Sequence, residues 1–433
     1  MEPVEGPLRE RAFRWFLTGR AVSLLGSSLA PVALAFAVLD ASGRASDLGV
    51  VAAAHMVPLL GFLLVGGAIS DRFPPRTVIV VANLGSGLTQ GTVAVVLLTG
   101  RYSLLVVASL ELANGVLAAF TTPALRGVVP RLVPPEELQR ANARLATTRN
   151  ATKILGPTVA GLLVVTTGSG TAIAVDAVSY LLAAACLLRV RLPRSTPPAP
   201  AGVLHDLAQG WTAFRGTRWL WTVTVAFALV NLANAGPWLV LGPVLTSPVT
   251  WGVVLSTRGV GMFVASVLMY GVRAPRLLRL GQLASVVGAV PLLALGLDAG
   301  AGWLVGAAVL AGLGSSVTAT AWDTTLGEHV PRAVLARVSS YDDLLSYAVI
   351  PLSQLAVGPL ADTLGARPVA LGAGVLYAAA AAAPLASRAV RELPRGTTKQ
   401  AASSQPDPLT DLDSAVRRWP GGRRGRADPS YDP

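Results

Sequence analysis

The sequence has few of the residues on which soluble enzymes and metal-binding proteins depend. Only 13% of its 433 residues are charged, about half the share of a soluble globular chain. Its single cysteine, Cys186, excludes an internal disulfide and a cysteine-based metal site. The three histidines are scattered and show no metal-ligand spacing. Walker and nucleophile-elbow motifs are also absent. These absences argue against an enzyme, and we expect no metal and no cofactor.

Apolar residues make up 52% of the chain, and the mean hydropathy is +0.58. They occur in runs of about 20 residues, the length that crosses a bilayer as a helix. The runs predict an all-α membrane protein with twelve transmembrane helices. We expect them near residues 16–39, 48–70, 77–99, 102–124, 150–166, 171–188, 219–240, 249–271, 280–298, 302–322, 342–361 and 368–387.

The basic residues fall almost entirely on one side of this predicted bundle. Of the 35 Lys and Arg residues, 29 lie in segments on the side of the N-terminus, while the opposite loops hold only Arg44, Arg101 and Arg367. Under the positive-inside rule, this asymmetry predicts a multi-pass protein of the cell membrane with both termini in the cytoplasm. It also accounts for the net charge of +12. We therefore expect the chain to lie in a lipid bilayer and to have no nucleic-acid partner.

Matches within the sequence indicate an internal repeat. A shift of 197 residues aligns Val133-Pro134 with Val330-Pro331 and Gly161 with Gly358, and shifts of 200 and 204 residues align further pairs. The repeat predicts two pseudo-symmetric six-helix halves, an architecture typical of transporters. We expect a first half over 1–190, a cytoplasmic linker with an amphipathic segment over 191–218, a second half over 219–393 and a disordered tail over 394–433.

Three motifs carry a resemblance to a known family. The segment 67–76, Gly-Ala-Ile-Ser-Asp-Arg-Phe-Pro-Pro-Arg, resembles the loop motif between helices two and three of the major facilitator superfamily, although prolines replace its glycine and first basic residue. The stretch around Gly156, Pro157 and Gly161 resembles the superfamily's antiporter motif. The run 123–142 resembles the drug and siderophore exporter branch that includes the enterobactin exporter.

The resemblance implies a cytoplasmic gate between the halves. Its members are Asp71, Arg72 and Arg76 of the loop, with the carboxylates Asp342 and Asp343 as candidate partners at the start of helix eleven, where the partly positive helix end favours acids. A purely structural role for Asp71, as a turn cap, is the alternative. Gly156, Pro157 and Gly161 are expected either to bend helix five or only to allow close helix packing.

Ionisable groups within spans are expensive and are therefore candidate site residues. Glu111 lies near the middle of span four, with Asn114 on the same helix face. Glu111 stands where the family pattern has arginine, and a desolvated carboxylate there can carry a proton. Three roles stay open for it: proton coupling, an ion pair or substrate contact involving Arg258 of span eight, and a neutral polar role.

Four further polar residues within the spans are given expected roles. Asn231 and Asn234 share a face of span seven and are candidates for lining the cavity. A structural role is expected for Asp176 in span six, and ordinary packing for His55 in span two.

These features predict a secondary active transporter, an efflux antiporter that exchanges protons for an amphipathic small organic molecule such as a drug, antibiotic or siderophore-like compound. This is a function associated with multidrug resistance. We expect the protein to be a monomer. The alternatives are an uptake symporter of the same fold and a non-transporting membrane sensor or scaffold.

Overall fold

The computed structural model describes residues 11–62, 74–126, 128–190, 211–212, 214–272 and 274–395, and within these ranges the regular structure is entirely helical. The first half contains α1 (Arg11–Ser42), α2 (Ala45–Gly61), α4 (Pro75–Leu98), α5 (Leu104–Arg126), α6 (Val129–Leu132), η1 (Pro135–Glu137), α7 (Leu138–Thr167) and α8 (Ser169–Leu188).

The second half has the same order of long helices, several of which are divided into shorter segments. It contains α10 (Arg218–Gly236), η2 (Pro237–Leu241), α11 (Gly242–Leu245), α12 (Pro248–Leu268), η3 (Met269–Gly271), α13 (Leu277–Val286), η4 (Val287–Ala289), α14 (Val290–Gly296), α15 (Ala301–His329), α16 (Arg332–Tyr347), α17 (Ile350–Leu364), α18 (Ala366–Ala382), η5 (Ala383–Ala386) and α19 (Arg388–Arg391).

The helices confirm a multi-pass membrane fold. Among the described residues, ten helices are long and apolar enough to cross a membrane. The other two expected positions hold α2, which is apolar but has 17 described residues, and α7, which has 30 residues but a polar first half with several arginines. Each of the twelve predicted spans therefore overlaps a described helix, and ten of them meet the length and apolarity of a membrane span.

Two short turns show how closely the halves repeat each other. Gly168 is the only residue between α7 and α8, and Gly365 is the only residue between α17 and α18. Both have φ of +89°, a conformation that is open to glycine and strained for other residues. They are 197 residues apart, the shift that the sequence repeat predicts.

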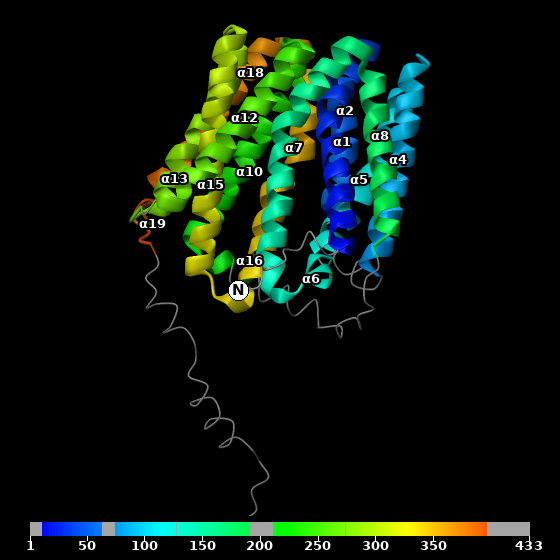
Figure 1. Cartoon of the computed structure of the whole chain (residues 1–433). Helices are drawn as coiled ribbons and strands as arrows, with labels where there is room; N and C mark the ends of the chain where they lie inside the picture. The colour runs from blue at the N-terminus through cyan, green and yellow to red at the C-terminus, as the bar shows by residue number, and fades with distance from the viewer. Residues whose placement is uncertain are drawn as a thin grey trace, which may run out of the picture.

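The helices form two bundles that lie side by side, with α7 running between them in the view of Figure 1. We call the end that carries the connections at residues 43–44, 99–103, 168, 246–247, 297–300 and 365 the short-loop end, and the opposite end, where α1, α4 and α7 begin, the tail end. The halves meet through two pairs of helices, α7 with α12 and α2 with α17.

Glycines allow both pairs to approach closely at the short-loop end. A Cβ at Gly161 would collide with the backbone of Pro248 at the start of α12, and a Cβ at Gly358 would collide with the backbone of Ser46 at the start of α2. Gly161 and Gly358 are partners under the 197-residue repeat. The two contacts are therefore equivalent under the pseudo-symmetry, and together they close the short-loop end of the bundle.

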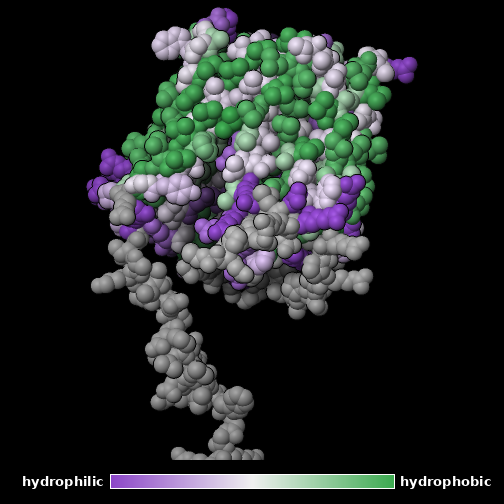
Figure 2. Space-filling view, viewed as in Figure 1, coloured by the Kyte–Doolittle hydropathy of each residue, from purple (hydrophilic) through white to green (hydrophobic). Residues whose placement is uncertain are grey.

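Apolar side chains cover the outside of the bundle as well as its core. Leu105, Leu88 and Trp303 are each more than 70% exposed, and the space-filling view shows a broad hydrophobic belt with hydrophilic residues gathered toward both ends (Figure 2). Such a belt suits contact with lipid acyl chains.

Candidate functional site

A cavity of about 300 Å³ lies between the two halves. That volume is at the lower end of the range for small-molecule sites. Most of its lining comes from the first half, and two residues of the second half, Leu239 of η2 and Gln354 of α17, complete it. The polar lining residues are Ser27, His55, Gln90, Glu111, Asn114, Asp176, Tyr180 and Gln354.

Glu111 is a deeply buried polar group of the cavity and is only 3% exposed. It lies seven residues into α5, about 10 Å along the helix axis from the short-loop end. Its Oε1 accepts a hydrogen bond from Gln90 Nε2 of α4 at 2.8 Å, and its Oε2 lies 3.2 Å from His55 Nδ1 of α2. Three helices therefore meet at this carboxylate.

Asn114 lies one turn beyond Glu111 on the same helix and also lines the cavity, as its spacing predicts. Asp176 of α8 provides a second carboxylate, with 1% of its surface exposed. Neither of its carboxylate oxygens has a hydrogen-bond partner among the described residues. The neighbouring Ser179 hydroxyl donates instead to the backbone carbonyl of Asp176, at 2.7 Å.

A break in the seventh span brings the second half to the cavity. The π-helical segment η2 begins at Pro237, which has no N–H to donate to the preceding turn. Ser353 of α17 holds the break: its hydroxyl accepts from the Gly236 N–H at 2.8 Å and donates to the Leu232 carbonyl at 2.6 Å. The segment presents Leu239 to the cavity, and π-helical turns of this kind are frequent at functional sites.

Three predicted site residues of the second half lie outside the cavity lining. Arg258 lies over the ring of Trp238, with its guanidinium carbon 5.2 Å from the ring centroid, whereas the contacts of Glu111 are with Gln90 and His55. Asn231 donates to the Ser346 carbonyl at 2.9 Å and so joins α10 to α16. Asn234 is half-buried on α10 and is absent from the lining.

The predicted gate is only partly within the described residues, because Asp71 and Arg72 lie outside them. Arg76 donates from Nε to the Leu187 carbonyl at 3.1 Å and from Nη2 to the Leu188 carbonyl at 2.5 Å, so it contacts the end of α8 within its own half. Asp342 is buried in the second half, where it accepts from Thr224 Oγ1 at 2.6 Å and Trp322 Nε1 at 2.8 Å. Asp342 and its neighbour Asp343 lie ten and eleven residues beyond Arg332, where α16 begins, so the prediction that they lie at the start of helix eleven was wrong.

The predicted helix-bend motif lies where α7 meets other helices. α7 is a single helix from Leu138 to Thr167 despite Pro157 inside it. Gly156 lies against Ser28 of α1, while Pro157 and Gly161 lie against Gly252 and Pro248 of α12. Pro157 and Gly161 therefore form part of the contact between the halves.

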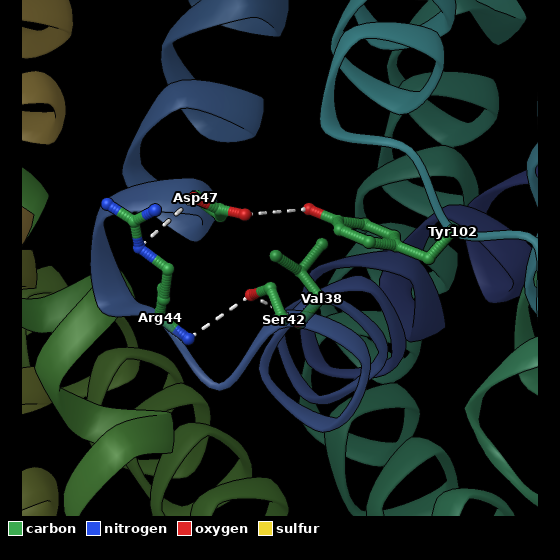
Figure 3. Close-up of polar contacts among 5 residues, drawn as sticks. All are labelled: Val38, Ser42, Arg44, Asp47 and Tyr102. Carbon is green, nitrogen blue, oxygen red and sulfur yellow. Dashed lines mark hydrogen bonds and ion pairs between the residues drawn. The ribbon is translucent and has the colours of Figure 1, made fainter.

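A second polar cluster lies at the short-loop end and joins three segments of the first half (Figure 3). Asp47, near the start of α2, lies 3.9 Å from Arg44 Nε and accepts from the Tyr102 hydroxyl at 3.4 Å. Burial and the adjacent Asp47 raise the pKa of Tyr102 to about 12. The phenol is therefore protonated at neutral pH and can donate to Asp47.

Sequence reasoning underrated three of the cavity residues. It assigned His55 to ordinary packing and Asp176 to a structural role, and it did not select Gln90. The position of an ionisable group in an apolar span was a usable signal for Asp176. Gln90 and His55 become informative only when the packing of α2 and α4 on α5 is known.

Apolar spanning helices in two pseudo-symmetric halves, with a polar cavity between them, define the architecture of a membrane transporter. A family model described as Major Facilitator Superfamily matches residues 16–350. The chain belongs to this superfamily, as the sequence motifs predicted.

Relatives within the superfamily have names that refer to efflux. The chain is 26% identical to the multidrug efflux pump Tap of Mycolicibacterium fortuitum over 366 residues, 78% of this chain and 87% of Tap. It is 27% identical to the enterobactin exporter EntS of Shigella flexneri over 76% of this chain and 80% of EntS. The crystal structure of the nucleoside transporter NupG has a similar fold, with a TM-score of 0.72 at 11% identity over 87% of this chain and 98% of NupG.

Proposed function

We propose that the protein is a proton-coupled exporter of amphipathic small organic molecules, with Glu111 as the group that binds the coupling proton. Export is supported by the relatives Tap and EntS, whose names describe efflux. We further propose a monomer in the cell membrane with both termini in the cytoplasm, on the basis of the distribution of its basic residues. The half, linker and tail boundaries expected from the sequence are part of this proposal.

One observation carries the coupling role: Glu111 connects α5 to α2, and α2 is one of the helices that close the short-loop end against α17. As a charged carboxylate, Glu111 accepts from Gln90, and it attracts His55 of α2, 3.2 Å away, when that imidazole carries its second proton. Protonation removes the charge and weakens the attraction to α2. Proton binding in the cavity is thereby linked to a helix that must move when the short-loop end opens.

The test compares Glu111→Gln with the wild-type protein in proteoliposomes, using a panel of labelled neutral and charged amphipathic compounds. Glutamine has the shape of a protonated glutamate and cannot release a proton. We expect accumulation driven by a proton gradient to disappear while exchange down the substrate gradient continues. Glu328→Gln, a matched change at the tail end, is the control and should keep both activities.

Three results would contradict the proposal. Full gradient-driven accumulation by a well-folded Glu111→Gln protein would remove Glu111 from coupling. A wild-type protein that moves none of the panel would favour the sensor or scaffold alternative. Accumulation in the direction of the proton flow would favour an uptake symporter.

A further inference from the structure

We propose that Asp176 binds the positively charged group of the substrate, so that the cavity selects amphipathic organic cations. This inference rests on the proposed transport function and adds the chemical class of the substrate. It begins from a difference between the two cavity carboxylates. Glu111 accepts a hydrogen bond from Gln90 and lies 3.2 Å from His55 Nδ1, whereas both oxygens of Asp176 lack a hydrogen-bond partner among the described residues.

A buried carboxylate that lacks partners is costly to keep charged. Asp176 is 1% exposed and lines the cavity together with Tyr180 and Ser27. Ser27 donates to the Tyr180 hydroxyl at 3.1 Å and thus fixes the ring beside the carboxylate. A substrate cation in the cavity would supply the counter-charge that the carboxylate lacks, and an aromatic ring nearby favours a cation as well.

The approach of α1 to α8 keeps Asp176 at the cavity wall. A Cβ at Gly26 of α1 would lie 2.8 Å from Asp176 Oδ1 and closer still to Ser179. A larger residue at position 26 would therefore push α1 away from α8 or turn the carboxylate. The glycine therefore lets α1 pack directly against Asp176 and Ser179 of α8.

The charges of the cavity walls agree with a cationic substrate. Lys and Arg outnumber Asp and Glu by 35 to 23 in the chain, yet the lining of the central cavity contains two acids and, among the described residues, no lysine or arginine. A second cavity of about 380 Å³ at the short-loop end lies between α1, α11 and α17, and its charged lining residues are Asp40 and Asp362. A cation leaving the central cavity toward that end would pass further acids.

The test is direct binding of radiolabelled tetraphenylphosphonium to the purified full-length protein in the absence of any gradient, with neutral triphenylphosphine oxide as competitor. We expect Asp176→Asn to weaken tetraphenylphosphonium binding at least about tenfold, because the variant keeps the shape of the side chain and loses its charge. Affinity for the neutral compound should change less than about twofold. Asp47→Asn is the control, because Asp47 is a buried acid of the same half that lies outside the cavity lining.

Unchanged tetraphenylphosphonium affinity in Asp176→Asn, or an equal loss for both compounds, would overturn the inference. So would failure of tetraphenylphosphonium to bind the wild-type protein. If the variant does not give monodisperse protein, the test is the affinity of the wild-type protein for tetraphenylphosphonium relative to the neutral compound. A ratio below about two would overturn the inference. Because binding is measured without a gradient, its outcome does not depend on whether Glu111 couples transport to protons.

Discussion

Buried charged and polar side chains in this protein obtain their partners from neighbouring helices. Glu111 accepts a hydrogen bond from α4 and lies beside His55 of α2, and Asp342 accepts hydrogen bonds from α10 and α15. Each arrangement offsets the cost of removing a carboxylate from water. Asp176 is the exception among these acids, which is why it stands out as a place for an external partner.

Arg76 gives a prediction at this scale, because the structure and the family resemblance suggest different roles for it. Its two hydrogen bonds go to the Leu187 and Leu188 carbonyls at the end of α8, and the Leu187 carbonyl also accepts from the Val190 N–H at 3.0 Å. Arg76→Ala should therefore lower the free energy of unfolding by about 1–2 kcal/mol, measured by thermal unfolding in detergent. The control is Arg279→Ala at an exposed arginine of α13, which should have little effect. Unchanged stability with slowed transport would instead favour the predicted gate.

At the scale of elements, the sequence predicted the helices well and their contacts poorly. Span positions follow from apolar runs alone, since each run must satisfy its own backbone in lipid. The 197-residue repeat correctly predicted equivalent positions in the two halves, as the turns at Gly168 and Gly365 show. The π-helical break at Pro237 and the approach of His55 to Glu111 depend on packing between helices that are distant in sequence. Local sequence patterns such as apolar runs do not predict contacts of this kind.

Ser353 gives a prediction about the break in the seventh span. Its hydroxyl is both acceptor and donor across α17 and α10, and Ser353→Ala would leave the buried Gly236 N–H without its partner. We expect a loss of about 1–3 kcal/mol in unfolding free energy. Ser315→Ala is the matched control, because that hydroxyl donates to Ala311 within its own helix. Equal stability of the two variants would show that Ser353 does not hold the break.

The contact between α2 and α17 gives a prediction about the closed end. Gly358→Leu places a side chain where the backbone of Ser46 lies, so the short-loop end should open. Spin labels at Arg101→Cys and Thr363→Cys, in a Cys186→Ser background, should then report longer distances. The control is Gly306→Leu, because nothing lies within 4 Å of a Cβ at that position. An unchanged distance distribution in Gly358→Leu would contradict the assignment of this contact as the closure.

At the scale of the whole molecule, the two halves contribute differently to a pseudo-symmetric scaffold. The first half provides both cavity carboxylates, while the second half provides Leu239 and Gln354, which complete the wall, and keeps Arg258 against Trp238. The two halves have therefore kept the same order of helices but differ in the charged residues that they bring to the cavity. Motion of one half against the other would change the surroundings of acids that stay fixed in the first half, and this arrangement suits alternating access.

The last prediction concerns the orientation of the whole bundle. The short-loop end carries Arg44, Arg101 and Arg367, and most other basic residues lie toward the tail end or beyond it in the sequence. The positive-inside rule then places the short-loop end outside the cell. In the Cys186→Ser background, cysteines at Arg44, Arg101 and Ser169 should react with a membrane-impermeant maleimide on intact cells. Cysteines at Arg131 and Ala274 should react only after the cells are opened. The opposite labelling pattern would reverse the proposed orientation and, with it, the direction in which the acidic cavity at the short-loop end would guide a substrate.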